Sequence, residues 1–340
     1  LDKINTFLTA NGWTADLHLG GDVLHIHKGA VFAHMKVALA GSLTELPWTN
    51  KGTGYDQAAP TDQIALSSSD SYLAGDFDTQ PGHPTNLDGG KEIGVVMEGL
   101  SDGSKNYWFF LGTSPDAFYC IAQVAADRYR FLAFGELDKV GTYTGGQFIS
   151  ASRSRFNVNS SGSYMPPLGC SKRSSTAQNT LVRVNHASFN GWVGAAYDPT
   201  GDAKSMSTGA RLATTLTADN DARRETGINN IRVPNYGSNK DLSVSPDWQG
   251  PAERAFNSGN SLSILLPVMA FMSRPDLSFH ASHSVIGKFP HCYYVNMANL
   301  NTDTVYVYGA ANYRAMATYS VSNNSETSFR AYAGLAFPVV

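Results

Sequence analysis

The chain has 340 residues, which is enough for two domains or for one large β domain with long insertions. Its 25 basic and 28 acidic residues leave a net charge of -3, so it lacks the basic surface on which nucleic-acid binding depends. Charged residues make up only 16% of the chain, and this low charge, with many Ser, Thr, Asn and Gly residues, suits a surface that other subunits cover. Many secreted β proteins share the same profile.

The cysteines and the apolar runs exclude two further classes. Cys120, Cys170 and Cys292 are odd in number and lack C-x-x-C spacing, so we expect reduced thiols and neither a disulfide framework nor a zinc knuckle. The longest apolar run, residues 264–272, contains Pro267 and is shorter than the roughly 18 residues of a membrane span. The chain starts at Leu1 without a signal-peptide pattern, so we expect that its start was trimmed.

The first elements are a helix and a hairpin. Apolar residues from Leu1 to Leu8 recur at helical spacing, which predicts a short amphipathic helix over residues 1–10, ended by Asn11 and Gly12. The period then changes to two, and residues 22–28 and 30–37 lie on either side of Gly29. This pattern predicts two half-buried antiparallel strands joined by a tight turn.

Long loops and then a meander follow. Residues 41–90 are rich in Gly, Pro, Ser, Asp and Thr, which predicts long loops with room for one short strand. Regular strands are predicted next, with turn residues between them, at residues 93–97, 106–111, 117–124 and 129–135.

The second half divides into a polar segment and another β unit. Within residues 150–260, only residues 181–184 and 192–197 have a strand pattern. Strands return towards the C-terminus at residues 293–297, 305–308, 316–321 and 329–337.

We therefore predict a mainly β, α+β protein built from antiparallel, meander or sandwich-like units with long loops. The predicted parts are an N-terminal helix (1–14), an N-terminal β domain (15–155), a long irregular interaction segment (156–260) and a C-terminal β unit (261–340). The third part has too few apolar runs to offset the loss of backbone entropy, so we expect other subunits to order it.

One block resembles a known family. Residues 129–139 and 141–148, which follow two aromatic-rich strands, resemble a block that recurs in virion structural proteins of tailed phages, of the tail or baseplate type. Upstream, residues 54–56 and 80–82 are similar to loop signatures of that family, so the resemblance covers roughly residues 15–152. It implies a structural role in a virion and supplies no catalytic residue.

Physical chemistry also gives this block a structural task. Its glycines allow tight turns with positive φ, and its phenylalanines can bury large apolar areas. We interpret it as a structural corner formed by Phe131, Phe134, Gly135, Gly141, Gly145, Gly146 and Phe148.

The sequence gives little support for catalytic or metal-binding residues. His25 and His27 share one face of a predicted strand, and His280 and His283, with His291 nearby, have a spacing that could ligate a metal. We interpret both pairs as ordinary histidines, because no carboxylate ligand accompanies them. Asp219, Asp221 and Glu225 are candidates for calcium binding, but the pattern of a calcium-binding loop is missing. Asp76 and Asp78 are a candidate pair for sugar hydrolysis, and nothing else in the sequence supports that role. We therefore expect no catalytic residue, no cofactor and no metal.

Loop aromatics are the remaining candidates. They could anchor neighbouring subunits, stack on sugars or pack at loop bases: Trp48, Tyr55, Tyr164, Trp192, Tyr236 and Trp248.

The function that we expect is that of a structural, non-enzymatic component of a tailed-phage virion, assembled in the host cytoplasm. Its partners would be other virion proteins and copies of itself, with no nucleic acid and no membrane span. The alternative is a tail-fibre or receptor-binding module that recognises host-surface carbohydrate, although no heptad run or repeat indicates a fibre shaft. A glycan-cleaving enzyme is the third class.

Overall fold

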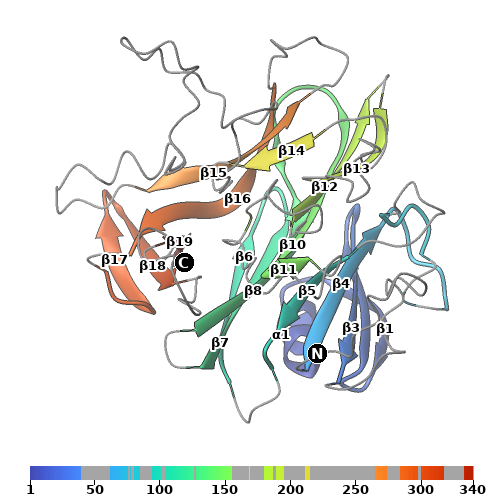
Figure 1. Ribbon diagram of the computed structural model, residues 1–340, viewed down its shortest axis with the longest axis horizontal. Coiled ribbons are helices and arrows are strands. Elements are labelled where there is room, and N and C mark those ends of the chain that lie inside the picture. The colour runs from blue at the N-terminus through green and yellow to red at the C-terminus, as the bar shows by residue number, and fades with distance from the viewer. Residues whose placement is uncertain are drawn as a thin grey trace, which may run out of the picture.

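A computed structural model of the chain describes residues 1–39, 62–75, 77, 80–84, 94–100, 105–125, 128–154, 168, 180–186, 189–194, 211–214, 265–273, 284–297, 300–317 and 333–339. These residues form one short helix and three antiparallel sheets (Figure 1). The prediction of a mainly β chain with a short N-terminal helix is confirmed. Within this part of the chain, no helix is long and apolar enough to cross a membrane.

The first sheet is formed mainly by the N-terminal part of the chain. Its strands, in spatial order, are β1 (Thr14–Leu19), β2 (Val23–Lys28), β3 (Val31–Ala38), β4 (Gln63–Ser69), β5 (Val95–Glu98) and β11 (Arg153–Ser154). The hairpin β2–β3 turns at Gly29, whose φ is +56°, as the sequence predicts. Strand β4 is buried along its whole length, although its region has the composition of loops.

The second sheet is a meander that two later strands extend. Its order is β13 (Phe189–Gly194), β12 (Thr180–His186), β10 (Thr144–Ala151), β8 (Arg128–Glu136), β7 (Ala117–Ala125) and β6 (Asn106–Gly112). Three of the four strands predicted as a meander, β6 to β8, are neighbours here, whereas the strand predicted at residues 93–97 is β5 of the first sheet. The strands β12 and β13 come from the segment expected to be mostly irregular. Apart from Leu168 and the strands β12, β13 and β14, the segment 156–260 lies outside the described residues.

The third sheet collects the C-terminal strands. Its order is β14 (Arg211–Thr214), β15 (Leu266–Ser273), β16 (Ser284–Asn296), β19 (Ala333–Pro338), β18 (Ala311–Ala317) and β17 (Thr304–Tyr308). The two-residue strand β9 (Asp138–Lys139) pairs with β16 and so joins the first half of the chain to this sheet.

The second sheet lies between two hydrophobic cores, and successive side chains alternate between them. On β7, Phe118 and Cys120 enter the core shared with the first sheet, whereas Tyr119 and Ile121 enter the core shared with the third. Because both faces are covered, residues 117–122 of β7 form a continuous apolar run rather than an alternating one.

The helix α1 (Asp2–Ala10) closes one end of the core between the first two sheets. Its residues Ile4 and Leu8 are buried at a spacing of four, which places them on one face of the helix. The Trp13 ring that follows the helix meets Phe134 edge-on at 5.4 Å. The apolar spacing at the start of the chain therefore predicts the face that the helix buries.

Candidate functional site

The phenylalanines of the structural corner are fully buried. Phe131 and Phe148 lie in the core between the second and third sheets, and Phe134 lies in the core between the first and second. Phe148 meets Phe289 of β16 edge-on at 4.8 Å, while Phe134 meets Phe118 at 5.2 Å. The block thus contributes large apolar side chains to both cores.

The corner also docks onto β16 through polar contacts. The Val140 amide and the Tyr143 hydroxyl both donate to the Ile286 carbonyl, over 3.0 and 2.9 Å. Lys288 of β16 forms an ion pair with Asp138 at 3.0 Å. Burial of Tyr143 raises the pKa of its hydroxyl, so this group remains a hydrogen-bond donor at neutral pH. The arrangement joins the second and third sheets.

Three of the four corner glycines have the predicted positive φ. Gly141 has a φ of +95°, and Gly145 and Gly146 each have +99°. Gly135 differs, because its φ is not positive. A Cβ at Gly135 would lie 2.6 Å from the Ala117 Cα, so this position requires glycine for close strand packing, and the predicted reason is wrong there.

Trp192 is the one candidate loop aromatic within the described residues. It lies in β13, which overlaps the strand predicted at residues 192–197, and it is only 4% exposed, so of the three roles considered it fits packing and not an exposed contact. Its indole Nε1 donates to the Gly82 carbonyl at 2.8 Å. The other five candidates lie outside the described residues: Trp48, Tyr55, Tyr164, Tyr236 and Trp248.

The predicted histidine pair on β2 is on one face of the strand, and each member has a separate partner. His27 lies 2.7 Å from Asp16 of β1 and stacks on Phe32 at 4.9 Å. His25 is fully buried and faces His34, which lies directly opposite it on β3. The two imidazoles therefore belong to different contacts and do not converge.

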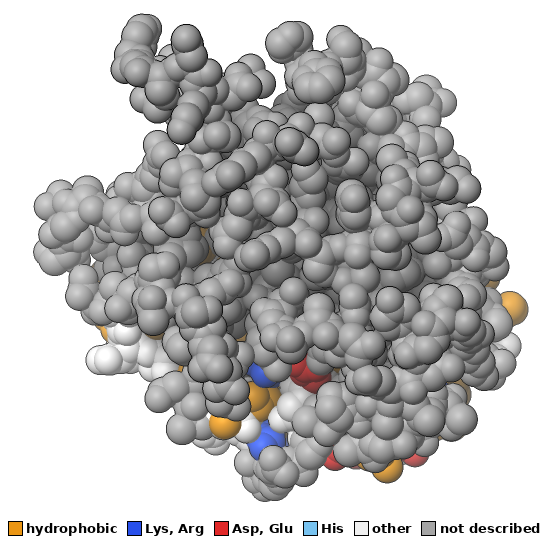
Figure 2. Space-filling model, in the orientation of Figure 1, with side chains coloured by type: hydrophobic (Ala, Val, Ile, Leu, Met, Phe, Trp, Pro, Cys, Tyr) orange, Lys and Arg blue, Asp and Glu red, His pale blue; other side chains and the backbone are white. Residues whose placement is uncertain are grey.

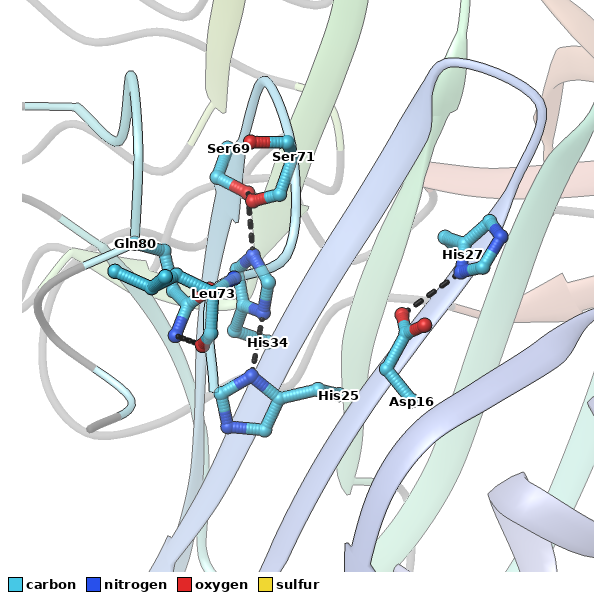
Figure 3. A network of polar contacts seen from close by, with 8 residues as sticks. All are labelled: Asp16, His25, His27, His34, Ser69, Ser71, Leu73 and Gln80. Atoms are coloured by element: carbon cyan, nitrogen blue, oxygen red, sulfur yellow. Dashed lines mark hydrogen bonds and ion pairs between the residues drawn. The ribbon is translucent and has the colours of Figure 1, made fainter. Parts of the chain in front are cut away.

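His25 and His34 begin a chain of hydrogen bonds that crosses three strands (Figure 3). The His25 and His34 Nδ1 atoms are 2.9 Å apart, and His34 Nε2 lies 2.6 Å from Ser69 Oγ at the end of β4. Ser69 Oγ in turn donates to the Ser71 carbonyl at 2.6 Å.

The last bond fixes the proton on each ring. A serine hydroxyl has one hydrogen, so Ser69 must accept from His34 Nε2–H. Burial keeps His34 neutral by lowering its pKa, so its Nδ1 is bare and accepts from His25 Nδ1–H. This leaves His25 Nε2 as a bare acceptor, and it is a buried atom without a hydrogen-bond partner.

Burial favours these neutral rings. Desolvation lowers the pKa of His25 from 6.5 to about 4, and the nearby Asp16 carboxylate opposes this shift only in part. Desolvation, followed by the proximity of His25 and His83, holds the pKa of His34 well below its usual value. Both rings are therefore uncharged at neutral pH.

Ser69, His34 and His25 have the order of a nucleophile, a base and an orienting group. Nevertheless all three are fully buried, and the Ser69 hydroxyl donates to a backbone carbonyl. No histidine is visible among the described side chains on the face in Figure 2, where the coloured atoms are mainly hydrophobic, basic and acidic. The geometry is that of a structural connection, because a substrate cannot reach Ser69 in this conformation.

The metal candidates converge nowhere in the described ranges. There, no group of three or more His, Cys, Asp or Glu side chains could hold a metal ion. His291 is exposed, and its Nε2 lies 3.0 Å from the Thr113 carbonyl. The remaining carboxylate and histidine candidates lie outside the described residues: Asp76, Asp78, Asp219, Asp221, Glu225, His280 and His283.

The described cysteines are free and buried. Cys120 lies in the core between the first two sheets and Cys292 in the other core. Burial raises the pKa of the Cys120 thiol to about 12 and that of Cys292 well above its usual value, so both remain thiols at neutral pH. Cys170 lies outside the described residues.

An apolar surface lies at the end of the third sheet. Among the described strands, β17 pairs only with β18, so its other side is an edge of the sheet. Val305 and Val307 lie on one face of β17 and are 42% and 76% exposed, and Tyr308 on the other face is 46% exposed. We call Thr304–Tyr308 with these exposed side chains the β17 edge. Sequence patterns predict the strand but give no sign that its edge is uncovered.

No protein-family model matches the chain, and no curated protein matches it either.

Proposed function

We propose that this protein is a structural, non-enzymatic component of a tailed-phage virion, in the tail or baseplate, where it assembles with copies of itself and with other virion proteins. The virion assignment is supported by the resemblance of residues 129–139 and 141–148 to a block that recurs in virion structural proteins of tailed phages. In the fold, this block belongs largely to the second sheet and pairs with β16 of the third. Its large side chains pack in both hydrophobic cores.

The observation that carries the assembly role is the β17 edge. An exposed strand edge presents unpaired backbone groups, and proteins that remain monomeric usually protect such edges with charges, prolines or bulges. β17 contains none of these protections, because its sequence is Thr-Val-Tyr-Val-Tyr with a regular pairing to β18. The edge strand β1, by contrast, contains Asp16 and has a register shift in its pairing with β2.

A second copy fits this edge in antiparallel pairing. If two β17 strands pair about Tyr306, Val305 of one copy lies opposite Val307 of the other, which is a favourable pair of β-branched side chains. The nearby carboxylate of Asp303 would lie opposite Gly309, and it is already neutralised by Arg314 at 3.2 Å. Such pairing therefore brings no like charges together.

Sedimentation velocity of the purified chain over a range of concentrations tests whether copies associate through the β17 edge. We expect self-association in the wild type and its loss in Val307→Lys, since a charge on the edge opposes strand pairing. Leu19→Lys is the matched control, because Leu19 is a 56% exposed apolar residue at the end of β1. A monomeric wild type, or equal association of Val307→Lys and the wild type, would contradict the β17 edge as the contact.

The virion assignment has its own test. Mass spectrometry of purified particles from a phage that encodes this chain should recover its peptides in stoichiometric amount. Their absence from the particle would overturn the assignment. Release of product from host polysaccharide by the purified protein, abolished by Asp76→Ala or Asp78→Ala, would instead favour the enzyme class.

A receptor-binding module is the second candidate, favoured by a group of tyrosines on one face of the third sheet. Tyr313 lies edge-on to Tyr293 at 5.4 Å and to Tyr308 at 6.3 Å, and Tyr306 is opposite Tyr313 on β17. Partly exposed aromatic rings with hydroxyl groups can stack on sugars and bond to them. Binding of host-surface carbohydrate that is lost in Tyr308→Ala would favour this candidate.

A further inference from the structure

The hydrogen bonds that link His25, His34, Ser69 and Ser71 lie on the outer face of the first sheet. They support a segment that connects two sheets. The described residues 70–75, 77 and 80–84 follow β4, and we call them the bridging segment. The Asp70 carboxylate forms an ion pair with Arg183 of β12 at 2.9 Å, and the Gly82 carbonyl accepts the Trp192 indole N–H of β13. The segment therefore starts at the first sheet and is attached to the second.

Internal bonds keep the bridging segment in one shape. The Asp70 amide donates to the Pro81 carbonyl at 2.8 Å, which closes the segment at its base. The Gln80 side chain bonds to both the amide and the carbonyl of Leu73, at 2.8 and 2.9 Å. Ser69 and Ser71, where the histidine chain ends, lie at the same base (Figure 3).

This chain of bonds is most stable when both rings are neutral, because protonation places a charge or an Nε2–H where no partner is present. A protonated His34 would donate from Nδ1, and His25 could accept only by moving its own hydrogen to Nε2, where it is buried without a partner. With both rings protonated, two Nδ1–H groups would face each other with no acceptor between them. A protonated His25 could still donate from Nδ1. Its charge and its Nε2–H would then be buried without a partner, which is strongly unfavourable.

We propose that the His25–His34 pair is an acid-sensitive lock, which holds the bridging segment against β12 and β13 while both rings are neutral and releases it when they are protonated.

Neighbouring charged groups influence the pH at which His25 and His34 are protonated. The titratable and charged groups on this sheet face and in the segment packed over it are, among the described residues, Asp16, His27, Lys36, Asp70, Tyr72, His83 and Glu98, and Arg183 of β12 pairs with Asp70. Asp16 favours a charged His25 but already contacts His27 at 2.7 Å, and His83 disfavours a charged His34. The Tyr72 ring lies edge-on against His25 at 5.3 Å. Protonation of His25 and His34 therefore requires a pH below the usual range of histidine.

Hydrogen exchange of the full chain tests the release. After correction for the intrinsic rate, amides of the bridging segment should exchange at least tenfold faster at pH 4 than at pH 7 in the wild type, while β7 and β8 stay protected. The double variant His25→Gln and His34→Gln, which keeps neutral hydrogen-bonding side chains, should lose this dependence on pH. His27→Gln, on the same strand and face, is the matched control and should respond as the wild type does.

Ring NMR gives a readout that does not depend on the variants. At pH 7 we expect a hydrogen on Nδ1 of His25 and on Nε2 of His34, and the two rings should take up protons together with the loss of protection. Equal protection of the bridging segment at pH 4 and pH 7, or titration of both rings near 6.5 without any change in exchange, would overturn the proposal. The same pH response in the wild type and in a folded double variant would also overturn it.

Discussion

Phe131 and Phe134 lie three residues apart on β8, and their rings belong to different hydrophobic cores. Both side chains are fully buried. We expect Phe131→Ala and Phe134→Ala each to lower the free energy of unfolding by about 3–5 kcal/mol, because each leaves a large cavity in a packed core. Chemical denaturation measures both. Leu19→Ala, on the surface, should change it by less than about 0.5 kcal/mol, and a similarly small effect of either phenylalanine would show that its face of the sheet is not packed.

Gly135 and Gly141 should respond differently to alanine. A Cβ at Gly135 would lie 2.6 Å from the Ala117 Cα and Cβ and 2.7 Å from the Asp116 carbonyl, whereas nothing lies within 4 Å of one at Gly141. Gly141→Ala should therefore cost only the strain of its positive φ, about 1–2 kcal/mol. Gly135→Ala must move strands β7 and β8 apart and should cost more. Thermal denaturation of the two variants compares them, and equal losses would argue against close strand packing at Gly135.

The stability of the fold should fall as the pH falls from about 6.5 towards 4. The pKa of His25 is about 4 in the folded chain and near 6.5 in the unfolded one, so the unfolded state binds more protons in this window. Above 6.5 the contribution of the neutral ring is fully present, and it is lost as the pH falls to 4. His25 alone should account for a loss on the order of 3 kcal/mol. Urea denaturation at several pH values measures the slope, and the His25→Gln variant should have a smaller one.

The buried thiols should not react in the native protein. The thiolate is the reactive form, and burial both raises the pKa of Cys120 and Cys292 and blocks access to them. In a Cys170→Ser variant, we expect no modification by a disulfide reagent at pH 8 under native conditions and two modified thiols in denaturant. Rapid modification of the native variant would show that a core opens.

The strands of the second sheet are the part of the fold that the sequence predicts best. Residues 117–124 and 129–135 are continuous apolar runs, and burial on both faces explains why no alternation is visible in them. The same runs do not reveal which core each side chain enters, because that depends on how the other two sheets pack. Strand β4 is harder to predict, since the serines that follow Leu66 are polar by composition and buried in the fold.

The hydrogen bonds from His25 to Ser71 show which part of the candidate site the sequence cannot predict. The spacing of His25 and His27 places them on one face of β2, and the structure agrees. Their partners come from β1, β3 and β4, and the pairing register of those strands is not encoded in local spacing. The role of Trp192 depends on a distant contact in the same way, because its partner Gly82 lies 110 residues earlier in the chain.

The second sheet also has a consequence for synthesis. Strands β6 to β10 leave the ribosome well before strands β15 to β19, which form most of the third sheet and cover Tyr119, Phe131 and Phe148. Until those strands emerge, one side of the nascent meander is a wide apolar surface that water contacts. A chain that terminates before residue 265 would keep this surface permanently, and it should be recovered as aggregate or bound to chaperones rather than as a soluble fragment.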